Sequence, residues 1–201
     1  MFTSDAYQDQ FANKILNGKR NGFFVDIGSC TAINSNNTFF FESLDWIGIC
    51  VEINPSYSTT YQYRKCKFIN DNALNLDYKK IFQQENAPKM IDYLSVDIDE
   101  LSLEAIKLLP HDEYQFKIIT IEHDGYIYED KYRKQQREFL KGLGYHLFAG
   151  NIRVPEVHFR SLNGLNHLDN NGFEDWWTHP SLNKSNFAFE NIYPESLLLQ
   201  I

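Results

Sequence analysis

Two apolar runs that each lead into an acid constrain the fold of this chain more than any other feature. The first run, Phe23–Ile27, contains Asp26 and leads into Gly28, where the chain must turn sharply. The second run, Trp46–Val51, leads into Glu52. A strand–helix–strand unit of this size places a glycine turn beside one part of a nucleotide, and an acid roughly 20 residues further on beside its ribose. The segment therefore predicts a binding site for an adenosine-type cofactor.

Size and charge limit the classes of protein to which the chain can belong. Its 201 residues suit one domain with a substantial core, and 43% hydrophobic residues are ordinary for a globular protein. The formal charge is -8, from 27 acidic and 19 basic residues, and the densest basic stretch, residues 131–137, is interrupted by Tyr132 and two glutamines. A nucleic-acid partner is not expected, because such proteins usually carry a basic stripe that displaces counterions from phosphates.

The cysteines and the apolar segments indicate a cytoplasmic protein. Cys30, Cys50 and Cys66 stand at no metal-ligand spacing, and Cys50 lies in an apolar run, so we expect free thiols. The N-terminus lacks the apolar stretch of a signal peptide, and no apolar run approaches the ~20 residues of a membrane span. We expect neither secretion nor a membrane partner.

Short apolar runs alternate with segments of helical spacing, which predicts an α/β fold. Strands are expected at 23–27, 46–51, 66–69, 91–96, 116–121, 145–149 and 173–177. Helices are expected within residues 1–20 and at 37–44, 55–64, 76–84, 101–109 and 132–143, and an irregular excursion over the cleft at about 155–186. Such a pattern indicates a Rossmann-like parallel sheet in a single domain, 1–201, with helices on both faces. Right-handed crossovers place the carboxyl ends of its parallel strands on one edge, where Asp26, Glu52, Asn72, Asp97 and residues 122–124 should converge.

Six ordered blocks of the sequence resemble a known family. They are Val25-Asp26-Ile27-Gly28, Asn37-Thr38 with Phe40-Phe41-Glu42, Gly48 to Pro55, Leu94 to Asp99, Thr120 to Asp124, and Glu174-Asp175-Trp176-Trp177. Together they span about residues 5–180 and resemble the FkbM-type methyltransferases, which are class I enzymes that use S-adenosylmethionine. The resemblance implies a seven-stranded, mostly parallel sheet with one antiparallel strand near the C-terminus. It also implies methyl transfer to a hydroxyl of a sugar, a glycan or a related small acceptor.

The same resemblance assigns cofactor contacts to individual residues. It implies that Asp26, Gly28 and Ser29 line the methionine part and that Glu52 binds the ribose. Asn37 and Thr38, at a helix start, would meet the cofactor carboxylate, because helix N-termini favour anions. Asp71, Asn72 and Ala73 would flank the adenine. Asp97 would face the methionine amino group or the acceptor. The chain departs from the family after Gly28, where Ser29, Cys30, Thr31 and Ala32 fill a loop that often carries a further glycine.

The acids near residue 123 suggest the catalytic chemistry. We expect His123 to remove the acceptor proton, oriented by Asp99 or Glu122. A second interpretation is a divalent cation held by Asp97, Asp99 and Asp124, although a metal is not expected. In a third, these acids cap helices and His123 is a satisfied hydrogen-bonding residue.

Acceptor contacts are expected from residues near the ends of the two late strands. Asp124 and Tyr126 would line the acceptor site, and the indoles of Trp176 and Trp177 would offer a flat surface to an acceptor ring. The alternative is that the tryptophans pack in the core. Two other functions remain open: a binding module whose Ser29–Ala32 loop blocks the cofactor, and a metal-dependent enzyme that uses a nucleotide sugar. A nicotinamide or flavin dehydrogenase is disfavoured, because Gly-x-Gly-x-x-Gly is absent.

Overall fold

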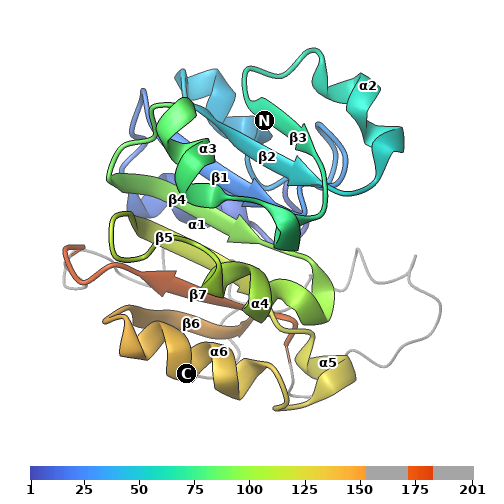
Figure 1. Ribbon diagram of the computed structural model, residues 1–201. Coiled ribbons are helices and arrows are strands. Elements are labelled where there is room, and N and C mark those ends of the chain that lie inside the picture. The colour runs from blue at the N-terminus through green and yellow to red at the C-terminus, as the bar shows by residue number, and fades with distance from the viewer. Residues whose placement is uncertain (153–171, 183–201) are drawn as a thin grey trace.

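A computed structural model describes residues 1–152 and 172–182 of the chain. These residues form one seven-stranded sheet in the order β3-β2-β1-β4-β5-β7-β6 (Figure 1). The strands are β1 (Phe23–Ile27), β2 (Ile47–Glu52), β3 (Lys67–Asn70), β4 (Met90–Val96), β5 (Gln115–Glu122), β6 (His146–Ile152) and β7 (Glu174–Thr178). All neighbours pair in parallel except β7, which runs antiparallel to both β5 and β6. The expected mostly parallel sheet with one reversed strand is confirmed.

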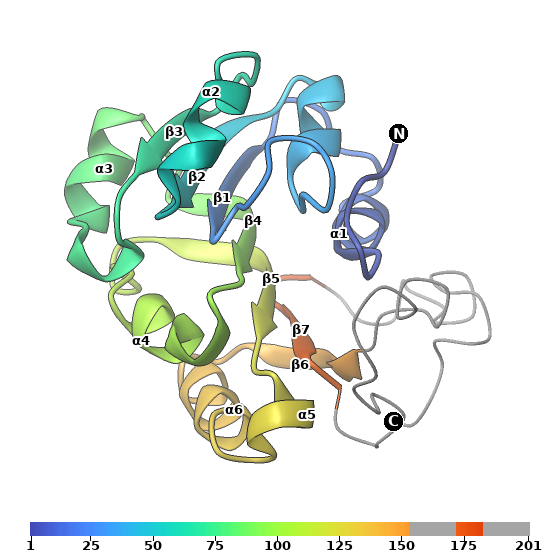
Figure 2. The same ribbon diagram turned by 90° about the vertical axis from the view of Figure 1, so that its right-hand side faces the viewer.

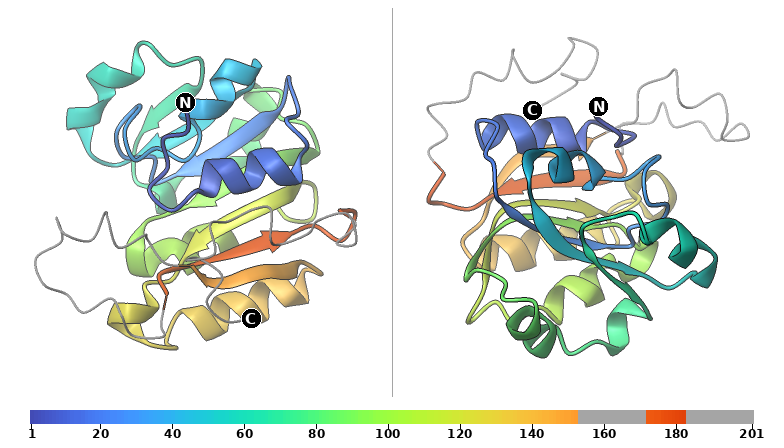
Figure 3. Two further views of the ribbon diagram at one scale, coloured as in Figure 1. Left: turned by 180° about the vertical axis from the view of Figure 1, so that it is seen from behind. Right: turned by 90° about the horizontal axis from the view of Figure 1, so that it is seen from above.

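Helices cover both faces of the sheet, as Figures 2 and 3 show. The α-helices are α1 (Gln8–Ile15), α2 (Ser58–Tyr61), α3 (Tyr78–Gln84), α4 (Ser102–Lys107), α5 (Gly125–Tyr128) and α6 (Arg133–Gly142). The 3-10 helices are η1 (Phe39–Leu44), η2 (Pro55–Tyr57), η3 (Ala73–Asn75) and η4 (Asp99–Leu101). Side chains of α3, α4 and α6 pack in the core on one face, and those of α1, η1 and α2 in the core on the other. Each strand can therefore be apolar on both sides.

The expected strands lie within a few residues of those observed, because short, nearly continuous apolar runs leave little choice of register. All five residues of β1 are buried, as are the last six of β4. Two expected helices are shorter than their sequence pattern: 37–44 becomes a 3-10 helix that starts at Phe39, and 55–64 becomes η2 followed by α2. Cys50 is fully buried and all three cysteines are free thiols, as expected.

The two adjacent tryptophans belong to the core and not to an acceptor surface. Both are fully buried in β7, which lies between β5 and β6. Trp176 stacks on Phe11 of α1 with 4.3 Å between ring centroids, whereas Trp177 belongs to the core on the opposite face. Consecutive residues of a strand point to opposite faces, so the two indoles cannot form one surface. The expectation that they contact the acceptor is wrong.

Two further expectations concern parts of the chain that are described only in part. The excursion expected at about 155–186 lies mostly outside the described residues, which resume at 172 and end at 182. Within the described ranges, no helix combines the length and the apolar character needed to cross a membrane.

Candidate cofactor and acceptor site

The acidic strand ends gather on one edge of the sheet, as the sequence predicts. Ile27 of β1 is in register with Val51 of β2 on one side and with Val96 of β4 on the other. Val96 is in turn in register with Ile121 of β5. The next residues along these strands therefore emerge together, in the spatial order Glu52, Gly28, Asp97 and Glu122. This carboxyl edge is where open α/β sheets bind ligands.

Gly28 makes a turn that no other residue could make without strain. Its φ is +83°, in the left-handed region, and a Cβ built on it would lie 1.8 Å from the carbonyl oxygen of Asp97. Its own N–H donates to the carbonyl of Val51 at 2.9 Å. The turn therefore passes in close contact with the main chain of both neighbouring strands, which only glycine permits.

Glu52 stands beside this turn with its carboxylate already oriented. Its Oε2 accepts from the Cys30 N–H at 2.9 Å, and its Oε1 accepts from the Asn54 N–H at 2.8 Å. A carboxylate oxygen can accept two hydrogen bonds, so each oxygen retains capacity for a hydroxyl. The Cys30 loop thus meets Glu52 through its main chain and does not displace the carboxylate. The next residue, Ile53, is 64% exposed and offers an apolar surface at the same place.

Asp26 lies beneath the edge and does not line it. It is 1% exposed, and its Oδ2 accepts from the Thr38 hydroxyl at 2.8 Å. Burial raises the pKa of Asp26 to about 6, against the opposing hydrogen bond from Thr38. Ser29 is also buried, and its Oγ lies 2.8 Å from the Tyr61 hydroxyl oxygen, with which it shares a hydrogen bond. Asp26 and Ser29 therefore stabilise the turn through buried hydrogen bonds to Thr38 and Tyr61.

The expectation that the helix start at Asn37 and Thr38 offers free N–H groups is wrong. The Asn36 side chain caps this start: its Oδ1 accepts from the N–H groups of Thr38 at 3.0 Å and Phe39 at 2.8 Å. Asn37 is buried and donates from Nδ2 to the Ser95 hydroxyl at 3.0 Å. Asparagine is a favoured N-cap because its oxygen satisfies these donors. A carboxylate cannot use the same N–H groups without displacing Asn36.

The residues assigned to the adenine follow β3 on the same edge. β3 pairs with β2 with Asn70 opposite Glu52, so the chain after Asn70 continues beside the Glu52 carboxylate. Asp71 is exposed, and Asn72 caps η3 by accepting from the Leu74 N–H at 2.9 Å. Ala73 is buried in the core. Of the three, Asp71 and the partly buried Asn72 are placed where they could reach a ligand.

Asp97 and Glu122 form the acidic end of the edge. Burial raises the pKa of Glu122 well above its usual value, and the neighbouring charge of Asp97 raises it further. Burial also raises the pKa of Asp97, against a hydrogen bond with Glu122. Two close carboxyl groups resist losing both protons, so such a pair holds one proton to higher pH than an isolated acid would.

A candidate cation site lies beside this pair. One ligand oxygen each from Asp99, Glu122 and Asp124 fall within 4.8 Å of one another. The Asp99 N–H donates to Glu122 Oε2 at 2.9 Å, which fixes the loop that carries Asp99. Three carboxylates are a donor set that Mg²⁺ or Ca²⁺ accepts. The set differs from the predicted one, because Glu122 takes the place of Asp97.

His123 is oriented by other groups than those predicted. Its Nδ1 accepts from the Gly125 N–H at 3.0 Å, and its Nε2 lies 3.4 Å from Asp175 Oδ1. Accepting at Nδ1 places the ring proton on Nε2, which faces the carboxylate. The side chain is fully buried, and this arrangement leaves no basic nitrogen directed at the cleft. Orientation by Asp99 or Glu122 is therefore wrong, and Gly125 and Asp175 orient the ring instead.

Asp175 is a buried anion that links α6, β6 and His123. It accepts from Arg137 Nε at 2.7 Å and Nη2 at 2.8 Å, and from the Asn151 N–H at 2.9 Å. Burial opposes its ionisation, but hydrogen bonds from Arg137 and His123 outweigh that cost and hold its pKa well below the usual range. His123 therefore has a structural role beside the buried ion pair of Arg137 and Asp175.

One buried acid, Glu174, was not singled out by itself in the sequence. It lies opposite Glu122 in the pairing of β5 with β7 and is 1% exposed. Its carboxyl accepts from Gln8 Nε2 at 3.2 Å and from Trp176 Nε1. Burial raises the pKa of Glu174 to about 8. Glu174 begins β7, in which all five residues are buried. In the sequence, the signal is a pair of acids directly before the two tryptophans of an expected strand.

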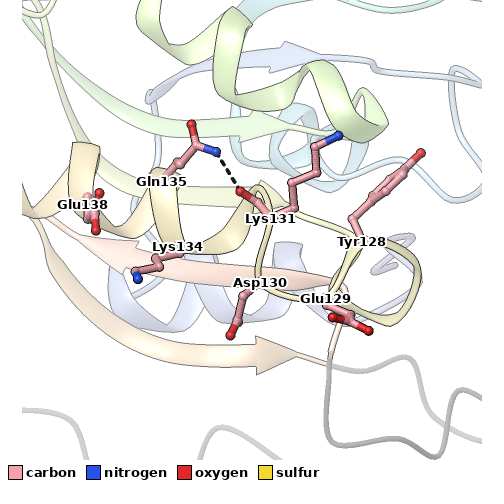
Figure 4. Close-up of a pocket in the computed structure, with 7 residues that line it drawn as sticks. All are labelled: Tyr128, Glu129, Asp130, Lys131, Lys134, Gln135 and Glu138. Carbon is pink, nitrogen blue, oxygen red and sulfur yellow. Dashed lines mark hydrogen bonds between the residues drawn. The ribbon is translucent and has the colours of Figure 1, made fainter.

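Two further features belong to α5 and the chain after it. Tyr126 belongs to α5, and its side chain lies outside the described part of the structure. The start of α6 and the chain before it form a surface hollow, shown in Figure 4. Its lining residues are Tyr128, Glu129, Asp130, Lys131, Lys134, Gln135 and Glu138. Charges of both signs line the hollow, and none of the residues assigned to cofactor or catalysis belongs to it.

Comparison with solved structures identifies the fold. A candidate O-methyltransferase from Klebsiella pneumoniae superposes with a TM-score of 0.55 at 11% identity, over 87% of this chain and 80% of that one. A candidate RNA methyltransferase from Pyrococcus horikoshii gives 0.54 at 12% identity, over 87% and 82%. A precorrin-6y C5,15-methyltransferase from Geobacter metallireducens gives 0.54 at 14% identity, over 85% and 87%.

The chain has the Rossmann-like fold of the class I methyltransferases. No protein-family model matches it, and no curated protein matches it by sequence. The proteins that share the fold are named for RNA, oxygen and precorrin methylation, so the fold alone does not select an acceptor. The acceptor must be argued from the side chains at the edge.

Proposed function

We propose that the protein is an S-adenosylmethionine-dependent methyltransferase of the FkbM type, acting on a hydroxyl of a sugar, a glycan or a related small acceptor. The observation that carries the proposal is the Glu52 carboxylate, held by two main-chain N–H groups beside the Gly28 turn. This carboxylate retains acceptor capacity for the two ribose hydroxyls. The shared fold supports the same assignment.

The described residues fit the cofactor at the nucleoside end. Glu52 would hold the ribose, and the exposed side chain of Ile53 would cover one side of the adenine. Asp71 and Asn72, which follow β3, would meet the adenine edge. When bound, the cofactor supplies a methyl group on a positively charged sulfur. Asp97, next to the Gly28 turn, would face that charge and orient it toward the acceptor.

The acidic pair is the best candidate for the proton acceptor. An attacking hydroxyl must lose its proton as the methyl group is transferred, and a carboxylate whose pKa lies closer to neutrality does this more effectively. Burial raises the pKa of both Asp97 and Glu122, and they lie at the end of the cleft next to the turn. We therefore assign the base to this pair instead of His123, whose Nδ1 accepts from the Gly125 N–H and whose Nε2 faces Asp175 at 3.4 Å.

The charge of the site supports a small acceptor over a nucleic acid. The protein carries a formal charge of -8, and Asp97, Asp99, Glu122 and Asp124 cluster at the acceptor end. A polyanionic backbone would be repelled from these carboxylates. Sugar hydroxyls, by contrast, donate readily to carboxylates, so a glycan or small polyol suits the same groups.

A second candidate mechanism uses a divalent cation. The observation that favours it is the close approach of Asp99, Glu122 and Asp124. A cation there would lower the pKa of a bound acceptor hydroxyl and reduce the need for a base. If methyl transfer were abolished by chelator and restored by Mg²⁺, this mechanism would replace the carboxylate base.

Two measurements test the proposal. Calorimetry should detect saturable binding of S-adenosylhomocysteine to the wild-type protein, and Glu104→Ala, in an exposed position of α4, should bind it equally well. Mass spectrometry of sugar and glycan acceptors incubated with isotope-labelled S-adenosylmethionine should then find a labelled O-methyl product. Absence of binding at millimolar ligand would favour the alternative of an inactive binding module. Turnover of a nucleotide sugar with a divalent ion alone would favour the third function.

A further inference from the structure

The loop between the Gly28 turn and η1 has a conformation that its own residues do not favour. Cys30 and Ser35 have φ values of 50° and 53°, in the left-handed region where side chains are strained. Such strain costs free energy and persists only when the surroundings enforce it. A glycine-rich loop would avoid this cost, but Gly28 is the single glycine between β1 and β2 outside the strands. Some other part of the protein must hold residues 29–38 in place.

Arg64, after α2, supplies one part of that restraint. Its side chain is 1% exposed, and its Nε donates to Glu42 Oε1 of η1 at 2.7 Å. Its Nη1 donates to the Ala32 carbonyl at 2.6 Å, and its Nη2 donates to the Thr38 hydroxyl at 3.2 Å. The planar guanidinium presents these donors in a fixed geometry. One side chain therefore ties the middle and the end of the loop to the start of the next helix.

Asn36 and Tyr61 extend the restraint to the beginning of the loop. Asn36 Oδ1 accepts from Arg64 Nη1 at 3.2 Å, while its Nδ2 donates to the Ser29 carbonyl at 2.8 Å and the Thr31 carbonyl at 2.9 Å. The Tyr61 hydroxyl also donates to the Ser29 carbonyl, at 2.9 Å. The carbonyls of Ser29 and Thr31, on either side of Cys30, are thus fixed by hydrogen bonds from buried side chains.

This arrangement fixes the Cys30 main chain, and the Cys30 N–H in turn holds Glu52. Its contact with Glu52 Oε2 at 2.9 Å is one of the two that orient the proposed ribose-binding carboxylate. A loop that is already ordered does not lose conformational entropy when a ligand binds. Loss of the restraint should therefore weaken ligand binding even though Arg64 lies too deep to touch the ligand.

We propose that Arg64 is a positioning residue for cofactor binding, which acts through residues 29–38 on Glu52. The inference rests on the proposed function, since it concerns the same site. It predicts that cofactor affinity depends on a buried side chain in a segment that has no contact with the cofactor. Arg64→Lys keeps the charge but not all of the donors, so its affinity should lie between those of wild type and Arg64→Met. If only the charge of Arg64 mattered, Arg64→Lys would bind as tightly as wild type.

The test measures S-adenosylhomocysteine affinity by calorimetry on full-length variants whose folding is checked by circular dichroism. Arg64→Met should raise the dissociation constant at least tenfold, with Arg64→Lys in between. Arg20→Met is the matched control, because Arg20 also pairs with an acid but is 57% exposed, and its dissociation constant should stay within twofold of wild type. Hydrogen exchange should show lost protection at the Cys30 N–H in Arg64→Met, with the β1 and β4 amides still protected.

The outcomes separate this inference from the proposed function. If the wild type binds no S-adenosylhomocysteine, both are overturned. If the wild type binds and folded Arg64→Met binds equally well, the inference alone is overturned. Should Arg64→Met not fold, Tyr61→Phe decides, because it removes only the hydroxyl that holds Ser29. A threefold or larger rise in its dissociation constant supports the inference, and an unchanged constant contradicts it.

Discussion

The two halves of the carboxyl edge hold the acids assigned to ligand binding and to proton transfer in opposite ways. Around β1 and β2, Glu52 is held by fixed main-chain donors, and a network of side chains sets the loop that provides one of them. Around β4, β5 and β7, Asp97 and Glu122 are half-buried and Glu174 is buried, and burial raises the pKa of each. The first arrangement suits recognition of a defined ligand, and the second suits holding and transferring a proton. Four predictions test that difference, in order of decreasing expected effect.

The largest effect is expected in the half that contains β7. Trp176→Ala should lower the free energy of unfolding by about 3–5 kcal/mol, because it removes a fully buried indole that stacks on Phe11. Denaturant unfolding measures this change. A stable variant with weakened acceptor binding would instead restore the acceptor-surface role that the structure rejects.

Gly28→Ala should destabilise the protein by about 2–4 kcal/mol, because it combines a left-handed φ with a main-chain clash against Asp97. Gly142→Ala, in α6 where a Cβ meets nothing within 4 Å, is the matched control and should be neutral or slightly stabilising. Thermal unfolding of the two variants compares them directly. Equal stability would show that the Gly28 turn is not tightly constrained.

Glu52→Ala should weaken S-adenosylhomocysteine binding by roughly 1–3 kcal/mol, the value of charged hydrogen bonds to the ribose. Stability should change less, because Glu52, although buried, lies at the carboxyl edge and not among the apolar side chains of the core. Calorimetry measures the affinity, with Glu104→Ala as the exposed control. An unaltered affinity would remove Glu52 from the ribose site and with it the distinction between the two halves.

The smallest change per measured step is a pH dependence of stability, because one proton changes the free energy of unfolding by at most about 1.4 kcal/mol per pH unit. The pKa of Glu174 is about 8 in the folded protein, against 4.5 for the ordinary group, so the folded state binds a proton that the unfolded state has lost. Stability from this group is therefore full below about pH 4.5 and is lost as the pH rises to about 8, by at most about 1.4 kcal/mol per pH unit. Denaturant unfolding between pH 5 and 8 should show a steeper fall for wild type than for Glu174→Gln. Identical slopes would contradict the raised pKa.

The sequence predicts the sheet well, because its strands are short apolar runs with polar residues at their carboxyl ends. It also predicts that Glu52, Asp97 and Glu122 meet at one edge, since parallel pairing allows little else, whereas Asp26 lies beneath that edge. Strand geometry alone separates Trp176 from Trp177, because adjacent residues in a strand face opposite sides. A capping side chain from residues 35–37 is predictable from their composition, and the same Asn36 cap occupies N–H groups that a ligand carboxylate would need.

Other features depend on contacts between residues far apart in the chain. His123 faces Asp175, and Arg64 reaches back to Ala32, Thr38 and Glu42. Neither contact has a local periodicity, because each forms only after strands and helices have packed. The exchange of Glu122 for Asp97 in the candidate cation set arises in the same way, from the loop that carries Asp99.

A crystal structure of the protein grown with S-adenosylhomocysteine tests the ligand assignment most directly. We predict density for the nucleoside beside β1 and β2, with both ribose hydroxyls within hydrogen-bonding distance of the Glu52 carboxylate and the thioether directed toward Asp97. Density elsewhere, such as in the hollow between α5 and α6, or a Glu52 carboxylate without ligand contacts at saturating concentration, would contradict it.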